Sequence, residues 1–210
     1  MRGKKKRRVE VSCFFLLLCA WLLYRDNSGM VVSALAACLL HELGHCAALL
    51  WAGNCVKQIT ITVLGAQIQP ERPMNYRQEL NVAAAGPAVN LMLALVFSRA
   101  SGGAAFAGVN LALGVFNLLP VGELDGARIL RSALAFAASD RTASAVYGCL
   151  EFCFTVIFAG AGMALAVRNR NLTLFFVSLW LLKRFGREKM MNLRKKNGNR
   201  ACHTVRKPLK

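Results

Sequence analysis

One stretch decides the fold class of this chain: residues 30–53, which read MVVSALAACLLHELGHCAALLWAG. The stretch is apolar almost throughout, and it is long enough to cross a bilayer as a helix, which takes about 20 residues. Its only charged or imidazole side chains are His41, Glu42 and His45. Because ionisable groups inside a membrane segment are costly and usually functional, this stretch predicts a membrane protein with a site inside it.

The composition of the whole chain agrees with this prediction. Of the 210 residues, 56% are hydrophobic and only 18% are charged, whereas a soluble domain carries about a quarter of charged residues. Five further apolar blocks can be marked, at about 10–24, 80–98, 104–120, 143–166 and 171–182. We therefore expect an α-helical polytopic membrane protein with about six transmembrane helices. The first block also resembles a signal peptide, but no small-residue cleavage site follows it, so we expect an uncleaved helix.

The net charge of +17 is concentrated at the two ends of the chain. Residues 2–8 contain six Lys and Arg, and residues 183–210 contain eleven. Six helices with both termini in the cytoplasm would put 23 of the 27 basic residues on the cytoplasmic side, as the positive-inside rule requires. We expect a multi-pass protein of the cell membrane, with a membrane domain over 10–182. Its basic tails, 1–9 and 183–210, would contact anionic lipid headgroups rather than nucleic acid.

Segment 57–69 has a different pattern. β-Branched and apolar side chains alternate with threonine in it: Ile59, Thr60, Ile61, Thr62 and Val63. This period of two predicts a strand, and Gly65 would allow a turn into a second short strand that ends at Pro70. We expect a membrane-associated β-hairpin that lines a protein cavity, because lipid cannot satisfy an open strand edge. The edge of strand 58–64 could hold a substrate in extended form, with Gly65 as a candidate substrate-binding residue.

The spacing of the polar residues in 30–53 indicates a metal site. On a helix, His41 and His45 lie one turn apart on the same face, so their two imidazoles can hold one zinc ion. Glu42 lies beside them, where it can take a proton from an attacking water molecule. The alternative, two buried histidines that hydrogen-bond to a neighbouring helix, does not explain three ionisable groups within five residues.

A catalytic zinc ion takes three protein ligands and leaves one position open, so a third ligand is needed. Asp125 is the best candidate, because Pro120 and Gly122 break the preceding helix and let the chain turn back. Two alternatives stay open. Glu123 is a rival ligand, and Asp125 could instead be the N-cap of a helix over 127–138.

Together these motifs resemble those of the site-2 protease family of intramembrane metalloproteases. The matching segments are His41-Glu42-Leu43-Gly44-His45, Gly86-Pro87-Ala88-Val89-Asn90, Asn117-x-x-Pro120 and Leu124-Asp125-Gly126. They cover about 35–130, and we place the catalytic core at about 30–130. The resemblance implies a three-helix core that binds zinc through His41, His45 and Asp125, with Glu42 as the general base.

The resemblance also implies that Asn117 and Asn90 position the substrate near the metal. For Asn90 a hydrogen bond between helices is the alternative, and Gly86 would then simply allow close packing. The loop around the aspartate departs from the family pattern, because Val121-Gly122-Glu123 stands where a second proline is common. The ligand itself is retained, so only the shape of the loop is in doubt.

We therefore expect a zinc metalloendopeptidase that cleaves membrane-associated protein substrates. The six-segment layout resembles the sporulation branch of the family, which processes a sigma-factor precursor. This suggests regulated intramembrane proteolysis of a transcription-factor precursor, with a regulatory membrane protein as a further partner. A membrane zinc transporter and a catalytically silent scaffold are the alternative functions.

Overall fold

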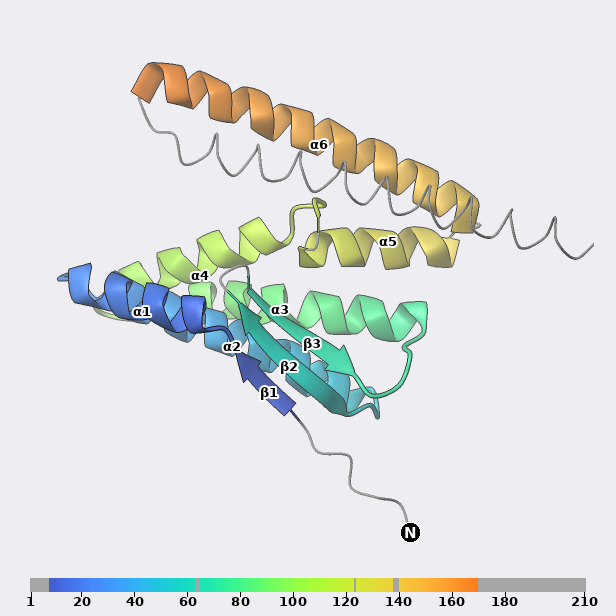
Figure 1. Ribbon diagram of the computed structural model, residues 1–210, viewed down its shortest axis with the longest axis horizontal. Coiled ribbons are helices and arrows are strands. Elements are labelled where there is room, and N and C mark those ends of the chain that lie inside the picture. The colour runs from blue at the N-terminus through green and yellow to red at the C-terminus, as the bar shows by residue number, and fades with distance from the viewer. Residues whose placement is uncertain (1–7, 63–64, 123, 138–139, 170–210) are drawn as a thin grey trace, which may run out of the picture. The chain divides into compact units, whose positions relative to one another are not determined.

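The computed structural model describes residues 8–62, 65–122, 124–137 and 140–169, which form three strands and six helices (Figure 1). In chain order the elements are β1 (Arg8–Val11), α1 (Cys13–Arg25), α2 (Met30–Trp51), β2 (Val56–Thr62), β3 (Gly65–Pro70), α3 (Tyr76–Phe97), α4 (Ala104–Asn117), α5 (Asp125–Ala137) and α6 (Asp140–Asn169). The chain divides into two compact units, residues 1–147 and 148–210. The first unit contains everything up to the start of α6. The expected apolar block at 171–182 and the basic C-terminal tail lie outside the described residues.

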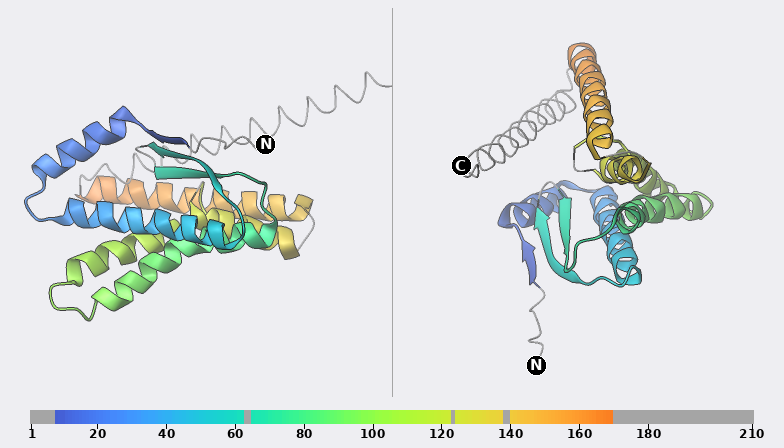
Figure 2. Two further views of the ribbon diagram at one scale, coloured as in Figure 1. Left: turned by 90° about the horizontal axis from the view of Figure 1, so that it is seen from below. Right: turned by 90° about the vertical axis from the view of Figure 1, so that its right-hand side faces the viewer.

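Helix α3 is the centre of the first unit, where it contacts α2, α4 and α5 (Figure 2). Glycine allows the closest of these approaches. A Cβ atom at Gly44 of α2 would lie 2.9 Å from Val89 Cγ2 and 3.0 Å from the Ala85 carbonyl oxygen of α3. Small residues at such contacts are typical of helices that pack within a membrane.

The distribution of polar and apolar side chains is the reverse of that in a soluble protein. The buried polar side chains of these helices include His41, His45, Asn90, Asn110 and Asp125. Large apolar side chains point outward instead, and Leu39, Leu43 and Leu111 are 61%, 51% and 50% exposed. A surface of this kind is stable in contact with lipid and would aggregate in water.

Two described helices, α2 and α3, are long and apolar enough to cross a membrane. Helices α1 and α4 are apolar but shorter, with 13 and 14 residues. The fold is therefore mostly helical and includes two helices of membrane-spanning length and composition, while the number of about six spans stays a prediction.

The three strands form one sheet in the order β1-β2-β3, in which β2 and β3 pair antiparallel over the segment predicted as a hairpin. Strand β1 pairs parallel with β2 and was not predicted, although its sequence Arg-Val-Glu-Val alternates in the manner of a strand. Because β2 is paired on both sides, the prediction that the edge of strand 58–64 receives a substrate is wrong. The edge strands of this sheet are β1 and β3. The association of the hairpin with a membrane stays a prediction.

The loop between α4 and α5 folds tightly onto the first turn of α5. A Cβ atom at Gly126 would overlap the Leu118 carbonyl group and lie 2.7 Å from the Leu119 carbonyl oxygen. Gly122 has a φ of 63°, which is a left-handed conformation that favours glycine. These two glycines let the chain reverse within a few residues, so that Asp125, the first residue of α5, comes back toward α2.

Candidate metal centre

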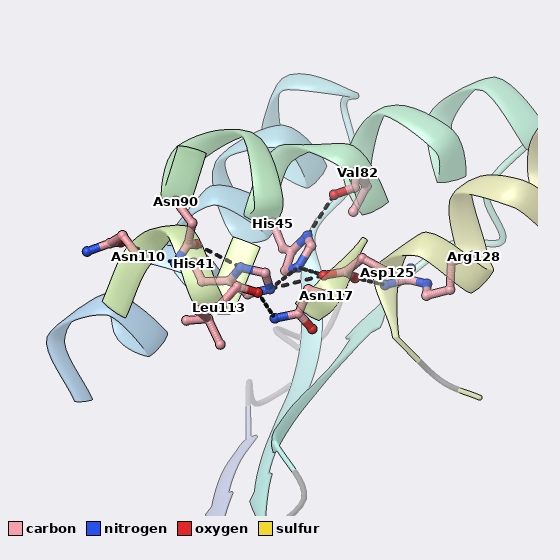
Figure 3. Close-up of polar contacts among 9 residues, drawn as sticks. All are labelled: His41, His45, Val82, Asn90, Asn110, Leu113, Asn117, Asp125 and Arg128. Atoms are coloured by element: carbon pink, nitrogen blue, oxygen red, sulfur yellow. Dashed lines mark hydrogen bonds and ion pairs between the residues drawn. The ribbon is translucent and has the colours of Figure 1, made fainter. Parts of the chain in front are cut away.

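The two histidines of α2 and Asp125 of α5 meet in the interior of the first unit (Figure 3). The Nε2 atoms of His41 and His45 are 3.1 Å apart. Asp125 Oδ2 lies 3.0 Å from His41 Nε2 and 3.1 Å from His45 Nε2. The three atoms therefore form a nearly equilateral triangle, and all three residues are buried.

This donor set fits a zinc ion. Zinc with four ligands at about 2.0–2.2 Å places neighbouring ligand atoms roughly 3.3 Å apart, close to the sides of the triangle. Two imidazole lone pairs and a carboxylate oxygen converge on one point and repel one another, and a cation at that point turns the repulsion into attraction. The structure thus brings together the three ligands that the sequence predicts.

The opposite side of each imidazole ring is held by a hydrogen-bond acceptor. His45 Nδ1 donates to the Val82 carbonyl oxygen at 2.7 Å, and His41 Nδ1 donates to Asn90 Oδ1 at 2.9 Å. A proton on Nδ1 leaves Nε2 with a free lone pair, which is the form that binds a metal. The second layer of contacts therefore prepares both rings for coordination.

The carboxylate of Asp125 is held from its other side by Arg128. A guanidinium nitrogen of Arg128 lies 3.7 Å from Asp125 Oδ1, and its Nε atom lies 4.0 Å from Glu79 Oε1 on α3. The ordinary pKa of an aspartate carboxyl lies far below 7, and the Arg128 guanidinium stabilises the ionised form. Asp125 is therefore an anionic ligand at neutral pH.

Gly86 of α3 lies directly against the two imidazoles. A Cβ atom at this position would overlap His45 Nε2 and lie 2.8 Å from His41 Cε1. The sequence left close packing between helices as one of the alternatives for Gly86. The structure shows a more specific reason, because the closest atoms belong to the metal ligands themselves.

The expected general base, Glu42, lies at the border between the site and the sheet. Its carboxylate interacts electrostatically with His41, His45 and Asp125, and it accepts a hydrogen bond from the backbone N–H of Ala66 in β3. Glu42 is only partly buried, unlike the three ligands. This position allows contact with the metal centre on one side and with an incoming molecule on the other.

Asn90 has a different place from the one expected of a substrate-binding residue. Its side chain is 0% exposed, and it contacts His41 on one side and Asn110 on the other. The alternative role given for Asn90, a hydrogen bond between helices, agrees better with these contacts. No motif pointed to Asn110 or Arg128, although an asparagine in the middle of the apolar block 104–120 was a signal.

The other expected substrate-binding residues are Asn117 and Gly65. Asn117 ends α4 beside the metal centre, and its Nδ2 donates to the Leu113 carbonyl oxygen at 3.1 Å (Figure 3). Gly65 is exposed and begins β3 with a φ of 118°. Contact of either residue with a substrate stays a prediction. The rival ligand Glu123 lies outside the described residues.

Comparisons with known proteins agree with this geometry. A sequence profile of peptidase family M50 matches residues 103–160, a range that contains Asp125 but not the two histidines. The chain is 34% identical to zinc metalloprotease Rip3 of Mycobacterium tuberculosis over 134 residues, which cover 54% of this chain and 32% of that protein. It is 37% identical over 118 residues to zinc metalloprotease sll0528 of Synechocystis, and these cover 50% of this chain and 31% of the relative.

The chain thus spans about a third of the length of these curated relatives. Among solved structures, the site-2 protease from Methanocaldococcus jannaschii matches with a TM-score of 0.60 and 23% identity. The match covers 86% of this chain and 89% of the archaeal chain. At this identity the likeness shows a shared fold.

Proposed function

We propose that this chain is a member of the site-2 protease family of zinc metalloproteases and that it hydrolyses peptide bonds of membrane-associated proteins. One observation carries the proposal. Three ligand atoms from His41, His45 and Asp125 converge within 3.1 Å of one another, with the carboxylate of Glu42 beside them on a helix of membrane-spanning length.

The roles of the chain's own residues follow from this arrangement. A zinc ion in the triangle would polarise the scissile carbonyl and lower the pKa of a water molecule toward neutrality. Glu42 accepts the proton of that water and passes it to the leaving amine. His41 and His45 each donate the Nδ1 proton to a neutral oxygen acceptor, so Nε2 is the ring atom that faces the metal. Asp125 supplies the negative charge that helps to retain the metal.

The sheet supplies a place for an extended substrate, and we assign it to β3 rather than to strand 58–64. Ile61 accepts a hydrogen bond from Ser12 on the β1 side, so its β3 partner Ala66 points its N–H away from β2, and this N–H interacts with Glu42. Successive N–H groups of a strand point to opposite sides, so the N–H of Ile68 points the same way as that of Ala66. Pro70 has no N–H to offer, which suits an edge strand. A substrate segment paired with β3 would lie extended beside Glu42.

The strand-addition step is tested with Ile68→Pro, which removes an outward N–H that pairing with β2 does not use. We expect cleavage of a membrane-tethered substrate to fall at least about tenfold while the zinc content stays at one ion per chain. Ile68→Ala is the matched control, because it shortens the same side chain and keeps the N–H. Full cleavage by the proline variant would rule out β3 as the docking edge.

The proposed function is tested with Glu42→Gln in the full chain, reconstituted in lipid vesicles. Removing a general base costs roughly 10²–10⁴-fold in rate, so cleavage should disappear while zinc is retained. A membrane zinc transporter would keep most of its zinc flux with this substitution, and a silent scaffold would show no cleavage in either form. Undiminished cleavage by the glutamine variant would refute the mechanism.

The finer expectations extend the proposal. Both termini would lie in the cytoplasm, so that the basic tails contact anionic headgroups. The substrate would be a membrane-tethered transcription-factor precursor, and a second membrane protein would regulate its cleavage. Co-expression with candidate precursors, scored for release of a soluble fragment by active chain and Glu42→Gln variant, tests the substrate class.

A further inference from the structure

Asn110 is a buried polar residue that the proposed mechanism does not use. It lies in the middle of α4, a helix whose other residues are apolar except for the terminal Asn117, and its side chain is 0% exposed. A buried amide is costly unless its donors and acceptor are paired. The partners of Asn110 are therefore informative about what it does.

The partners of Asn110 form a chain of hydrogen bonds across three helices (Figure 3). Asn110 Nδ2 donates to the Phe106 carbonyl oxygen at 2.9 Å. Asn90 Nδ2 donates to Asn110 Oδ1 at 3.2 Å, and Asn90 Oδ1 faces His41 Nδ1 at 2.9 Å. This series of hydrogen bonds thus begins at a backbone carbonyl of α4 and ends at a metal ligand of α2.

The Phe106 carbonyl fixes the direction of every hydrogen bond in this series. The Phe106 carbonyl can only accept, so Asn110 must turn its NH₂ group toward it and its oxygen toward Asn90. Asn90 must then present its own NH₂ group to Asn110 and its oxygen to His41. His41 can satisfy that oxygen only with a proton on Nδ1, and in the neutral imidazole this leaves Nε2 unprotonated.

We propose that Asn110 is a positioning residue of the metal centre, which acts through Asn90 to hold His41 in its metal-binding tautomer. The inference rests on the zinc site of the proposed function and assigns a role to a residue outside it. His45 needs no such relay, because its Nδ1 partner is the Val82 carbonyl, which cannot reverse its polarity. The amide of Asn90 can turn over and present NH₂ to His41, unless Asn110 prevents it.

Two substitutions of similar size separate this role from packing. Asn110→Leu fills the space but has no hydrogen-bonding atoms, so Asn90 is free to turn over and His41 can carry its proton on Nε2. Asn110→Asp places a carboxyl group in an apolar interior, where it stays protonated. Its O–H can donate to the Phe106 carbonyl oxygen, and its own carbonyl oxygen can accept from Asn90. Each hydrogen bond of the series therefore keeps its direction of donation.

The experiment measures zinc affinity of the full chain in detergent micelles by competition with a chelator. We expect Asn110→Leu to weaken zinc binding by about tenfold, the lower end of the effect of removing an outer partner of a ligand. Asn110→Asp should remain within about twofold of the wild type. Asn110→Ala replaces the leucine variant if circular dichroism shows that leucine prevents folding, and the same loss is expected.

A double substitution tests whether Asn110 acts through Asn90. If it does, Asn90→Leu combined with Asn110→Leu should bind zinc no more weakly than Asn90→Leu alone. Wild-type affinity in Asn110→Leu, equal losses in the leucine and aspartate variants, or multiplied losses in the double variant would each overturn the inference. A wild-type chain that binds no zinc would instead overturn the proposed metal centre itself.

Discussion

At the scale of single residues, the metal centre depends on how closely α3 approaches the imidazoles of α2. Gly86→Ala adds one methyl group, which would overlap His45 Nε2. Alanine normally stabilises a helix by up to about 1 kcal/mol relative to glycine, so a loss at this position must come from the clash. We expect the variant to bind zinc at least about tenfold more weakly, measured by chelator competition.

The matched control for this prediction is Gly108→Ala on α4, where a Cβ atom would have no neighbour within 4 Å. This variant should bind zinc normally and unfold at the same or a slightly higher temperature. Zinc binding by Gly86→Ala as tight as that of the wild type would show that the ligands are not packed against α3.

Single residues were predicted well where chemistry depends on spacing along one helix. His41 and His45 are such a pair, because four residues always bring two side chains to the same helix face. Asp125 required knowledge of how a loop turns, so from the sequence Glu123 and an N-cap role stayed open as alternatives. The partner of Asn90 could not be predicted, because it depends on how α2, α3 and α4 are rotated against one another.

At the scale of elements, α5 is attached to the core through Arg128, which lies between Asp125 of α5 and Glu79 of α3. Arg128→Met keeps most of the length of the side chain and removes its charge. Since the Arg128 side chain is 34% exposed, solvent screens these ion pairs and their loss should cost about 1 kcal/mol or less. We expect zinc affinity to fall a few-fold in the chelator competition.

Arg131→Met is the control for this prediction. Arg131 lies on the same helix, and its guanidinium stacks on the ring of Tyr147 at 4.5 Å. The zinc affinity of the Arg131→Met variant should equal that of the wild type. Equal losses in both variants would indicate a general loosening of α5 rather than a specific effect on Asp125.

Elements with a simple local period were also predicted well. The apolar blocks 30–53 and 80–98 correspond to α2 and α3, although α3 begins earlier, at Tyr76. Its start is set by a capping box, in which Asn75 and Gln78 exchange hydrogen bonds between side chain and backbone. The position of β1 beside β2 was not predictable in the same way, because pairing between distant segments leaves no local pattern.

At the scale of the whole molecule, the metal would connect segments that are far apart in the chain, since its ligands lie on α2 and α5. A ligand that binds only the folded state stabilises it, by about 4 kcal/mol at a concentration a thousand times the Kd. Removal of zinc by a chelator should therefore lower the unfolding temperature of the detergent-solubilised chain. His41→Ala is the control, because its unfolding temperature should not respond to the chelator. An equal response would mean that zinc acts elsewhere.

The most direct test of the account is X-ray absorption at the zinc edge of the purified full chain. The triangle of His41, His45 and Asp125 predicts one zinc ion per chain with nitrogen and oxygen ligands at about 2.0–2.2 Å and the outer-shell scattering of two imidazoles. The chain has eight cysteines, which provide a clear alternative. A sulfur shell at about 2.3 Å, or no bound zinc, would contradict the assignment of the metal centre.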